Sequence, residues 1–154
     1  MTNATHSHGL QRFIDFYQQP LNSAALTALP TLYHPEIHFI DPAHTIDGLP
    51  AFQRYFDNMV ANIGHCQFVV HAAVQDQPQS LMAFVDWTMS VQHRRLNGGQ
   101  LFTVAGCSKL RFSDTSDDAA IIYHQDFFDL GAMLYERLPL LGGLVRRIRS
   151  RLGS

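Results

Sequence analysis

Apolar positions near the start of the chain recur at helical spacing and are interrupted by prolines. One repeat begins at Leu10 and stops at Pro20, which predicts a first helix. A second apolar stripe over 22–34 predicts another helical segment, which Pro30 is expected to shorten or kink. Residues 1–8 are polar, and we expect them to be disordered.

A short strand and a long helix come next. Residues 36–41 alternate between apolar and polar positions, which predicts a strand that Pro42 stops and that carries Asp41 on its apolar face. Aromatic and aliphatic positions then repeat at helical intervals over 49–64. Pro50 suits the first turn of this third predicted helix, because a proline there loses no helical hydrogen bond.

The apolar period changes from helix to strand after this helix. Four long alternating segments separated by turn residues predict an antiparallel meander, with strands over 66–75, 80–93, 100–113 and 119–128. Leucines and other apolar positions after 129 predict one or two short amphipathic helices. Their basic face is formed by Arg146, Arg147, Arg149 and Arg151.

The order of these segments defines the fold class. Helices and strands are segregated along the chain, which indicates an α+β protein. A curved antiparallel sheet with helices on its concave face would enclose a pocket, and we expect function to lie there. The chain has no internal repeat or linker, so we expect residues 1–154 to form a single domain.

Composition and charge narrow the choice of partners. The chain is 46% hydrophobic and only 16% charged, which excludes a disordered chain or a coiled coil. A net charge of -2 argues against nucleic-acid binding over the whole surface. The arginines of the C-terminal segment indicate either an anionic partner or, as we favour, a solvated helix face.

Cysteine usage and hydropathy indicate a cytoplasmic protein with no membrane partner. Cys66 and Cys107 are the only cysteines and lack a CxxC spacing, so neither a disulfide framework nor a cysteine zinc site is expected. No segment has the ~18 consecutive apolar residues that a membrane span needs. Nine histidines suggest a metal, but no HxH, HExxH or His/Cys spacing among them fixes three ligands, so we expect no metal.

Two local motifs carry a resemblance to a known superfamily. Residues 32–42, LYHPEIHFIDP, are followed by Asp47-Gly48 and an aromatic helix, and residues 122–129, IYHQDFFD, run into 131–134. This order resembles the nuclear transport factor 2-like (NTF2-like) superfamily, which includes ketosteroid isomerase and the SnoaL-type polyketide cyclases. The resemblance implies a cystatin-like cone, a pocket between sheet and helices, and a homodimer.

The resemblance suggests how an isomerase site would be built. Asp41 resembles the general base in the Asp-Pro motif of ketosteroid isomerases, although it could instead cap the following turn. Phe13 stands where that family has a donor tyrosine, so we assign the donor role to Tyr17, one helical turn later. Ser108 stands where the family has a protonated acid.

A second acid–base group is predicted near the end of the last strand. Asp129, together with His124, resembles the acid–base aspartate of SnoaL-type cyclases, although Asp129 could instead cap the next helix. Asp126 shares a strand face with His124 by alternation, so the two could form a tuned acid–base pair.

Several further residues are expected to contact a ligand. Alternation leaves open whether the Trp87 face or the Asp86 face of strand 80–93 lines the pocket. The predicted catalytic set is Asp41, Asp126, Asp129, His124 and Tyr17, and the predicted substrate contacts are Tyr33, His44, Phe56, Trp87 and Ser108.

These residues support two hypotheses about function. The first is a cofactor-independent isomerase or cyclase that moves protons on a small apolar carbonyl compound. The alternative is a non-catalytic ligand-binding or interaction module of the same fold, with the basic C-terminus as a further docking element. A homodimer is also expected, because one face of strand 80–93 carries more apolar surface than water should contact. That face is formed by Leu81, Ala83, Val85, Trp87, Met89 and Val91.

Overall fold

The computed structural model describes residues 6–133 and 141–152 and contains one curved six-stranded sheet. The spatial order of the strands is β2-β1-β6-β5-β4-β3, and every neighbouring pair is antiparallel except β1 and β6. The predicted meander and the α+β class are confirmed, but the sheet is mixed rather than wholly antiparallel. The strands are β1 Tyr33–Ile40, β2 Thr45–Asp47, β3 Ile63–Val74, β4 Met82–His93, β5 Phe102–Phe112 and β6 Ile121–Phe128.

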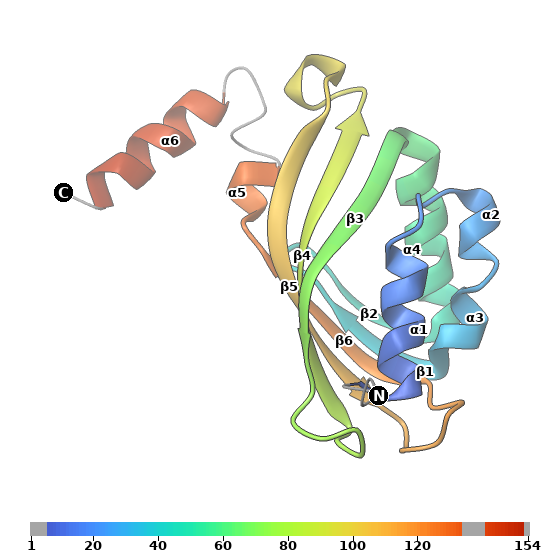
Figure 1. Ribbon diagram of the computed structural model, residues 1–154. Helices are drawn as coiled ribbons and strands as arrows, with labels where there is room; N and C mark the ends of the chain where they lie inside the picture. The colour runs from blue at the N-terminus through green and yellow to red at the C-terminus, as the bar shows by residue number, and fades with distance from the viewer. Residues whose placement is uncertain (1–5, 134–140, 153–154) are drawn as a thin grey trace.

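The four N-terminal helices lie together on one face of the sheet, which curves around them (Figure 1). They are α1 His8–Tyr17, α2 Ser23–Leu26, α3 Leu29–Leu32 and α4 Leu49–Asn62. A single 3-10 turn, η1 Asn97–Gly99, joins β4 to β5, and α5 Leu130–Met133 and α6 Leu141–Leu152 follow the last strand. None of the helices in the described part of the chain is long and apolar enough to cross a membrane.

The helix starts follow from short polar caps. The Ser7 hydroxyl accepts a hydrogen bond from the backbone N–H of Leu10 and so begins α1 at His8. The predicted disorder of 1–8 is therefore wrong for residues 6–8, and residues 1–5 lie outside the described part. Asn22 caps α2 in the same way.

β1 is longer than the sequence predicts. It begins at Tyr33 rather than at residue 36, and it tolerates Pro35 because its pairing with β6 shifts register between Tyr33 and His38. The three residues of β2 pair back on β1 as a hairpin that was not predicted, since so short a strand resembles a turn. The predicted segment 22–34 is likewise divided into α2 and α3.

Alternation in β4 is resolved by burial. Val85, Trp87 and Met89 are buried beneath the helices, whereas Phe84 on the opposite face is 43% exposed. Apart from Leu81, which is 40% exposed, the apolar face that suggested a dimer is therefore part of the core of one chain. The apolar face of β4 is therefore no longer an argument for a dimer.

Candidate functional site

A cavity of about 70 Å³ lies between α1, α4 and the covered face of the sheet. Its walls are mostly aromatic, and the only charged side chains in the lining are the carboxylates Asp41 and Asp126, together with the titratable His124. No lysine or arginine is among the lining residues. The aromatic wall is formed by Phe13, Tyr17, Phe39, Tyr55, Phe56, Phe68, Trp87 and Phe128.

Asp126 lies at one polar end of this cavity, and both its neighbours bind the same oxygen. Its Oδ1 accepts the Ser108 hydroxyl at 2.5 Å and lies 2.8 Å from His124 Nε2. Its Oδ2 has no hydrogen-bond partner among the described residues, and the side chain is 18% exposed. One oxygen is thus held in place while the other is free to contact a ligand.

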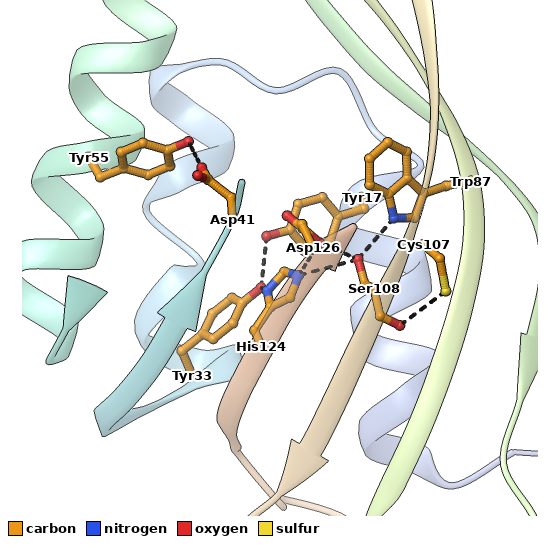
Figure 2. A network of polar contacts seen from close by, with 9 residues as sticks. All are labelled: Tyr17, Tyr33, Asp41, Tyr55, Trp87, Cys107, Ser108, His124 and Asp126. Carbon is orange, nitrogen blue, oxygen red and sulfur yellow. Dashed lines mark hydrogen bonds and ion pairs between the residues drawn. The ribbon is translucent and has the colours of Figure 1, made fainter. Parts of the chain in front are cut away.

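A buried chain of hydrogen bonds continues behind this carboxylate (Figure 2). His124 Nδ1 lies 3.0 Å from the Tyr33 hydroxyl, which lies 2.7 Å from the Tyr17 hydroxyl. His124 is only 2% exposed and packs edge-on against Phe13 and Phe39. The chain connects the cavity-lining Asp126 to the cavity-lining Tyr17 through two residues from β1 and β6.

The phenols of this site remain protonated. Burial raises the pKa of Tyr17 far above its ordinary value, and the hydrogen bond between Tyr17 and Tyr33 offsets only part of this increase. Burial also raises the pKa of Tyr33, with a further contribution from Tyr17. Each of the two hydroxyl groups therefore keeps its hydrogen at neutral pH and can donate it.

Asp41 lies at the other polar end and is held by several donors. Its Oδ1 accepts the backbone N–H groups of Ala43 and His44 at 2.7 Å each, and its Oδ2 accepts the Tyr55 hydroxyl at 2.7 Å. His44 Nδ1 lies 3.1 Å from Oδ1. Burial, followed by the Asp41 charge, raises the pKa of Tyr55. These contacts match the alternative in which Asp41 caps the following turn, because its carboxylate accepts backbone N–H groups of that turn.

Trp87 is fixed over a glycine on the neighbouring strand. Its Nε1 donates to the Ser108 hydroxyl oxygen at 2.9 Å, so the indole supports the same serine that holds Asp126. Gly106 faces Trp87 in the β4–β5 register, and a Cβ atom there would lie 2.2 Å from the ring. Only glycine leaves room for the indole in this position.

The structure brings some predicted residues together and separates others. Of the predicted set, seven line the cavity: Tyr17, Asp41, Phe56, Trp87, Ser108, His124 and Asp126. Tyr33 lies behind the lining at 1% exposure, and the half-exposed His44 reaches the site only through Asp41. Asp129 is not a lining residue; it forms an ion pair with Arg149 Nη2 at 2.9 Å.

The predicted set of site residues omits part of the lining. Tyr55, Phe68 and Phe128 lie on the cavity wall, and Tyr55 also binds Asp41. The alternation of β3 and β6 could have indicated the two phenylalanines once the inward face was known. Within residues 6–133 and 141–152, no group of three or more His, Cys, Asp or Glu side chains is placed to hold a metal ion.

Solved structures with this architecture come from several bacteria. An NTF2-like protein of unknown function from Burkholderia pseudomallei K96243 superposes with a TM-score of 0.69 at 15% identity, over 83% of this chain and 95% of its own. A candidate SnoaL-like polyketide cyclase from Jannaschia sp. CCS1 gives 0.68 at 12% identity, over 87% and 94% of the two chains. At these identities the similarity shows the fold alone.

A third structure contains a small ligand. A protein with a ketosteroid isomerase-like fold from Catenulispora acidiphila DSM 44928, in complex with trimethylamine, gives a TM-score of 0.66 at 17% identity. It matches 88% of this chain and 96% of its own. A search of curated proteins finds no match.

The family itself is shown by a direct match of the sequence. The model of the SnoaL-like domain matches residues 9–118, well over half of the chain, from α1 to the turn before β6. The superposition on a solved structure of NTF2-like fold agrees with this match. This chain therefore belongs to the SnoaL-like domain family.

Proposed function

We propose that the protein is an acid–base enzyme that moves a proton on a small, largely apolar carbonyl compound without a metal or organic cofactor. The observation that carries the proposal is the carboxylate of Asp126, which lines an aromatic cavity and has Oδ2 without a hydrogen-bond partner among the described residues, while Ser108 and His124 hold Oδ1. A base so placed is fixed in position and close to any bound ligand.

The chemistry would proceed through an enolate. Asp126 Oδ2 takes a proton from a carbon next to the carbonyl, and the electrons of that C–H bond form the enolate. The Tyr17 hydroxyl donates a hydrogen bond to the enolate oxygen. If Asp126 returns the proton to another carbon, the reaction is an isomerisation. If the enolate carbon instead attacks a second carbonyl of the same molecule, a C–C bond forms, the resulting alkoxide takes the proton from Asp126, and the reaction is a cyclisation.

The other predicted carboxylates receive different parts. We assign Asp41 to shaping the cavity, because two backbone N–H groups and Tyr55 already occupy its oxygens. Asp129 receives no part in the chemistry, because it pairs with Arg149 outside the lining.

Deuterium exchange tests the proposal without knowledge of the natural substrate. The protein is incubated in D₂O with a panel of small cyclic ketones, and proton NMR follows loss of the signals next to the carbonyl. We expect exchange above the buffer rate for at least one ketone, abolished by Asp126→Asn. Tight binding without exchange across the panel would contradict the enzyme hypothesis and favour a binding module.

A second function is supported by the lining itself. Eight aromatic rings and two carboxylates, with no lysine or arginine, form a surface suited to a small organic cation. The Catenulispora neighbour in complex with trimethylamine is consistent with such a ligand. In this version the protein binds an alkylammonium ion and releases it unchanged, and it shows retention without deuterium exchange.

The assembly and location of the protein complete the proposal. We propose a single domain in a cytoplasmic homodimer, with no nucleic acid bound. The outer sheet face supports the dimer, because Val74, Phe84 and Phe127 are 62%, 43% and 49% exposed there. Sedimentation at micromolar protein concentration giving a species of 17.4 kDa would contradict the dimer.

A further inference from the structure

The side-chain donors that line the cavity are committed to partners inside the protein. The Tyr55 hydroxyl donates to Asp41, the Trp87 indole donates to Ser108, and the Ser108 hydroxyl donates to Asp126. His124 Nε2 lies 2.8 Å from Asp126 Oδ1, and because a carboxylate oxygen can only accept, we assign the hydrogen of this contact to Nε2. Apart from Tyr17, the lining offers no free hydrogen to a ligand.

The hydrogen bond between the Tyr17 and Tyr33 hydroxyls can reverse its donor and acceptor. Either hydroxyl can donate across their 2.7 Å contact, and the direction depends on what Tyr33 does with its own hydrogen. Tyr33 in turn contacts His124 Nδ1, whose role depends on the protonation of the ring.

When His124 is neutral, the hydroxyl hydrogens of Tyr17 and Tyr33 point along the hydrogen-bond chain toward His124 and away from the cavity. Nε2 carries the hydrogen that faces Asp126, so Nδ1 is a lone pair that accepts the hydrogen of Tyr33. The Tyr33 oxygen then accepts the hydrogen of Tyr17. The cavity is left with acceptors only, chiefly Asp126 Oδ2 and the lone pairs of the phenol oxygens.

When His124 is an imidazolium, the donors and acceptors between His124, Tyr33 and Tyr17 are reversed. Both ring nitrogens now donate, so Nδ1–H bonds to the Tyr33 oxygen and the Tyr33 hydrogen turns to Tyr17. The Tyr17 hydrogen is released from the chain and points into the cavity. No atom has to move far, since only hydroxyl rotors and one added proton change.

We propose that His124, acting through Tyr33, selects the class of ligand that the cavity accepts. With His124 neutral the cavity takes ligands that donate hydrogen bonds, such as alkylammonium ions. With His124 protonated it takes ligands that accept, such as ketones and enolates. This inference rests on the proposed function, because it defines when Tyr17 can assist an enolate, and it makes Tyr33 and His124 positioning residues.

The groups that face His124 come from every element packed around it. They are Tyr17 and Phe13 from α1, Tyr33 and Phe39 from β1, Ser108 from β5 and Asp126 from β6. Among them Asp126 is the one charged group in contact with the ring, and it remains the partner of Nε2 in both forms. Protonation therefore changes the direction of the Tyr33 contact and leaves the Asp126 contact in place.

A matched pair of ring compounds tests the proposal by binding. Cyclopentanone only accepts hydrogen bonds, and cyclopentylammonium donates them from a ring of the same size. Affinities are measured by NMR titration at a series of pH values, and the protonation of the His124 ring is read at each pH from its ¹⁵N signals. We expect ketone affinity to fall about five- to tenfold, the effect of one hydrogen bond, as His124 loses its proton. Ammonium affinity should rise in the same interval.

Tyr33→Phe separates the relay from a general pH effect. This variant cannot pass the state of His124 to Tyr17, so ketone affinity should become nearly independent of pH. Tyr123→Phe is the matched control, because it removes a half-buried phenol hydroxyl that donates to Gln125 instead. An unchanged pH profile in Tyr33→Phe, or the same trend for both ring compounds in the wild-type protein, would overturn the proposal.

The ¹⁵N signals of His124 test the proposal even if neither ring compound binds. The proposal requires the neutral ring to carry its hydrogen on Nε2, and a neutral ring protonated on Nδ1 would refute it. These readouts are binding and tautomer, whereas the proposed enzymatic function is decided by deuterium exchange. The relay can therefore hold in a protein that catalyses nothing, and catalysis can occur without it.

Discussion

Two carboxylates line the same cavity and are held in opposite ways. Asp41 binds two backbone N–H groups of its own turn and the Tyr55 hydroxyl, so both of its oxygens are engaged by neighbours close in the fold. Asp126 is held through one oxygen by side chains from β5 and β6 and leaves the other accessible. The comparison separates a carboxylate that stabilises a turn from one that is available for chemistry.

The largest expected effect concerns the available carboxylate. Asp126→Asn should lower the rate of deuterium exchange into a responsive ketone by about 10²–10⁴-fold, since a positioned general base contributes that much. Asp129→Asn is the control, because it neutralises a nearby carboxylate that does not line the cavity, and it should change the rate less than about threefold. Equal losses in both variants would remove the distinction between these two carboxylates.

Alkaline pH should lower the free energy of unfolding, and each end of the cavity should contribute according to the number of buried phenols that it holds. Burial raises the pKa of Tyr17, Tyr33 and Tyr55, so above about pH 10 the unfolded chain binds fewer protons than the folded one. The stability they contribute is therefore fully present below about pH 9 and falls as pH rises, by about 1.4 kcal/mol per pH unit for each phenol.

Urea unfolding at several alkaline pH values measures this slope. The double variant Tyr17→Phe/Tyr33→Phe should remove about twice as much of the slope as Tyr55→Phe. Equal slopes in the two variants would contradict an equal contribution from each of the three phenols.

Loss of the Asp41 side chain should act mainly on stability. Asp41→Ala leaves two backbone N–H groups and a phenol hydroxyl without their acceptor, which should lower the free energy of unfolding by about 2–4 kcal/mol. Asp41→Asn keeps an oxygen acceptor and should cost about 1 kcal/mol. If Asp41→Asn folds stably but abolishes exchange, Asp41 is the base after all.

The smallest expected effect comes from the donor to Asp41. Tyr55→Phe removes one hydrogen bond of a well-held carboxylate and should cost about 1 kcal/mol in urea unfolding. Exchange activity should stay within a few-fold of the wild-type rate. A loss comparable to that of Asp126→Asn would place Tyr55 in the chemistry rather than in the turn.

Local sequence patterns were sufficient for much of the fold. Proline at the second position and repeated aromatic residues marked α4, and turn residues between long alternating segments marked β3 to β6. The same alternation placed His124 and Asp126 on one strand face, where they now lie 2.8 Å apart. Each of these features depends on neighbours in sequence, which is the information that a single chain provides directly.

Features that depend on distant pairing could not be read in this way. The contact between Tyr33 and His124 joins residues brought together by the parallel pairing of β1 and β6, for which the sequence carries no signal. Alternation in β4 showed two sets of residues but not which set the helices cover, because Phe84 on the outer face is as apolar as its neighbours. Asp129 was grouped with the site by motif, whereas its side chain pairs with Arg149.

The indole of Trp87 lying over Gly106 has a consequence for the evolution of ligand size. The floor of the cavity at this point is a side chain resting on bare backbone, so a smaller residue at 87 would deepen the cavity without moving a strand. That change would also take away the indole donor and expose a lone pair of Ser108. Residue 87 therefore couples the length of the ligand to its polarity. An evolved variant with a smaller residue there would admit a longer ligand and would at the same time favour a ligand that donates a hydrogen bond.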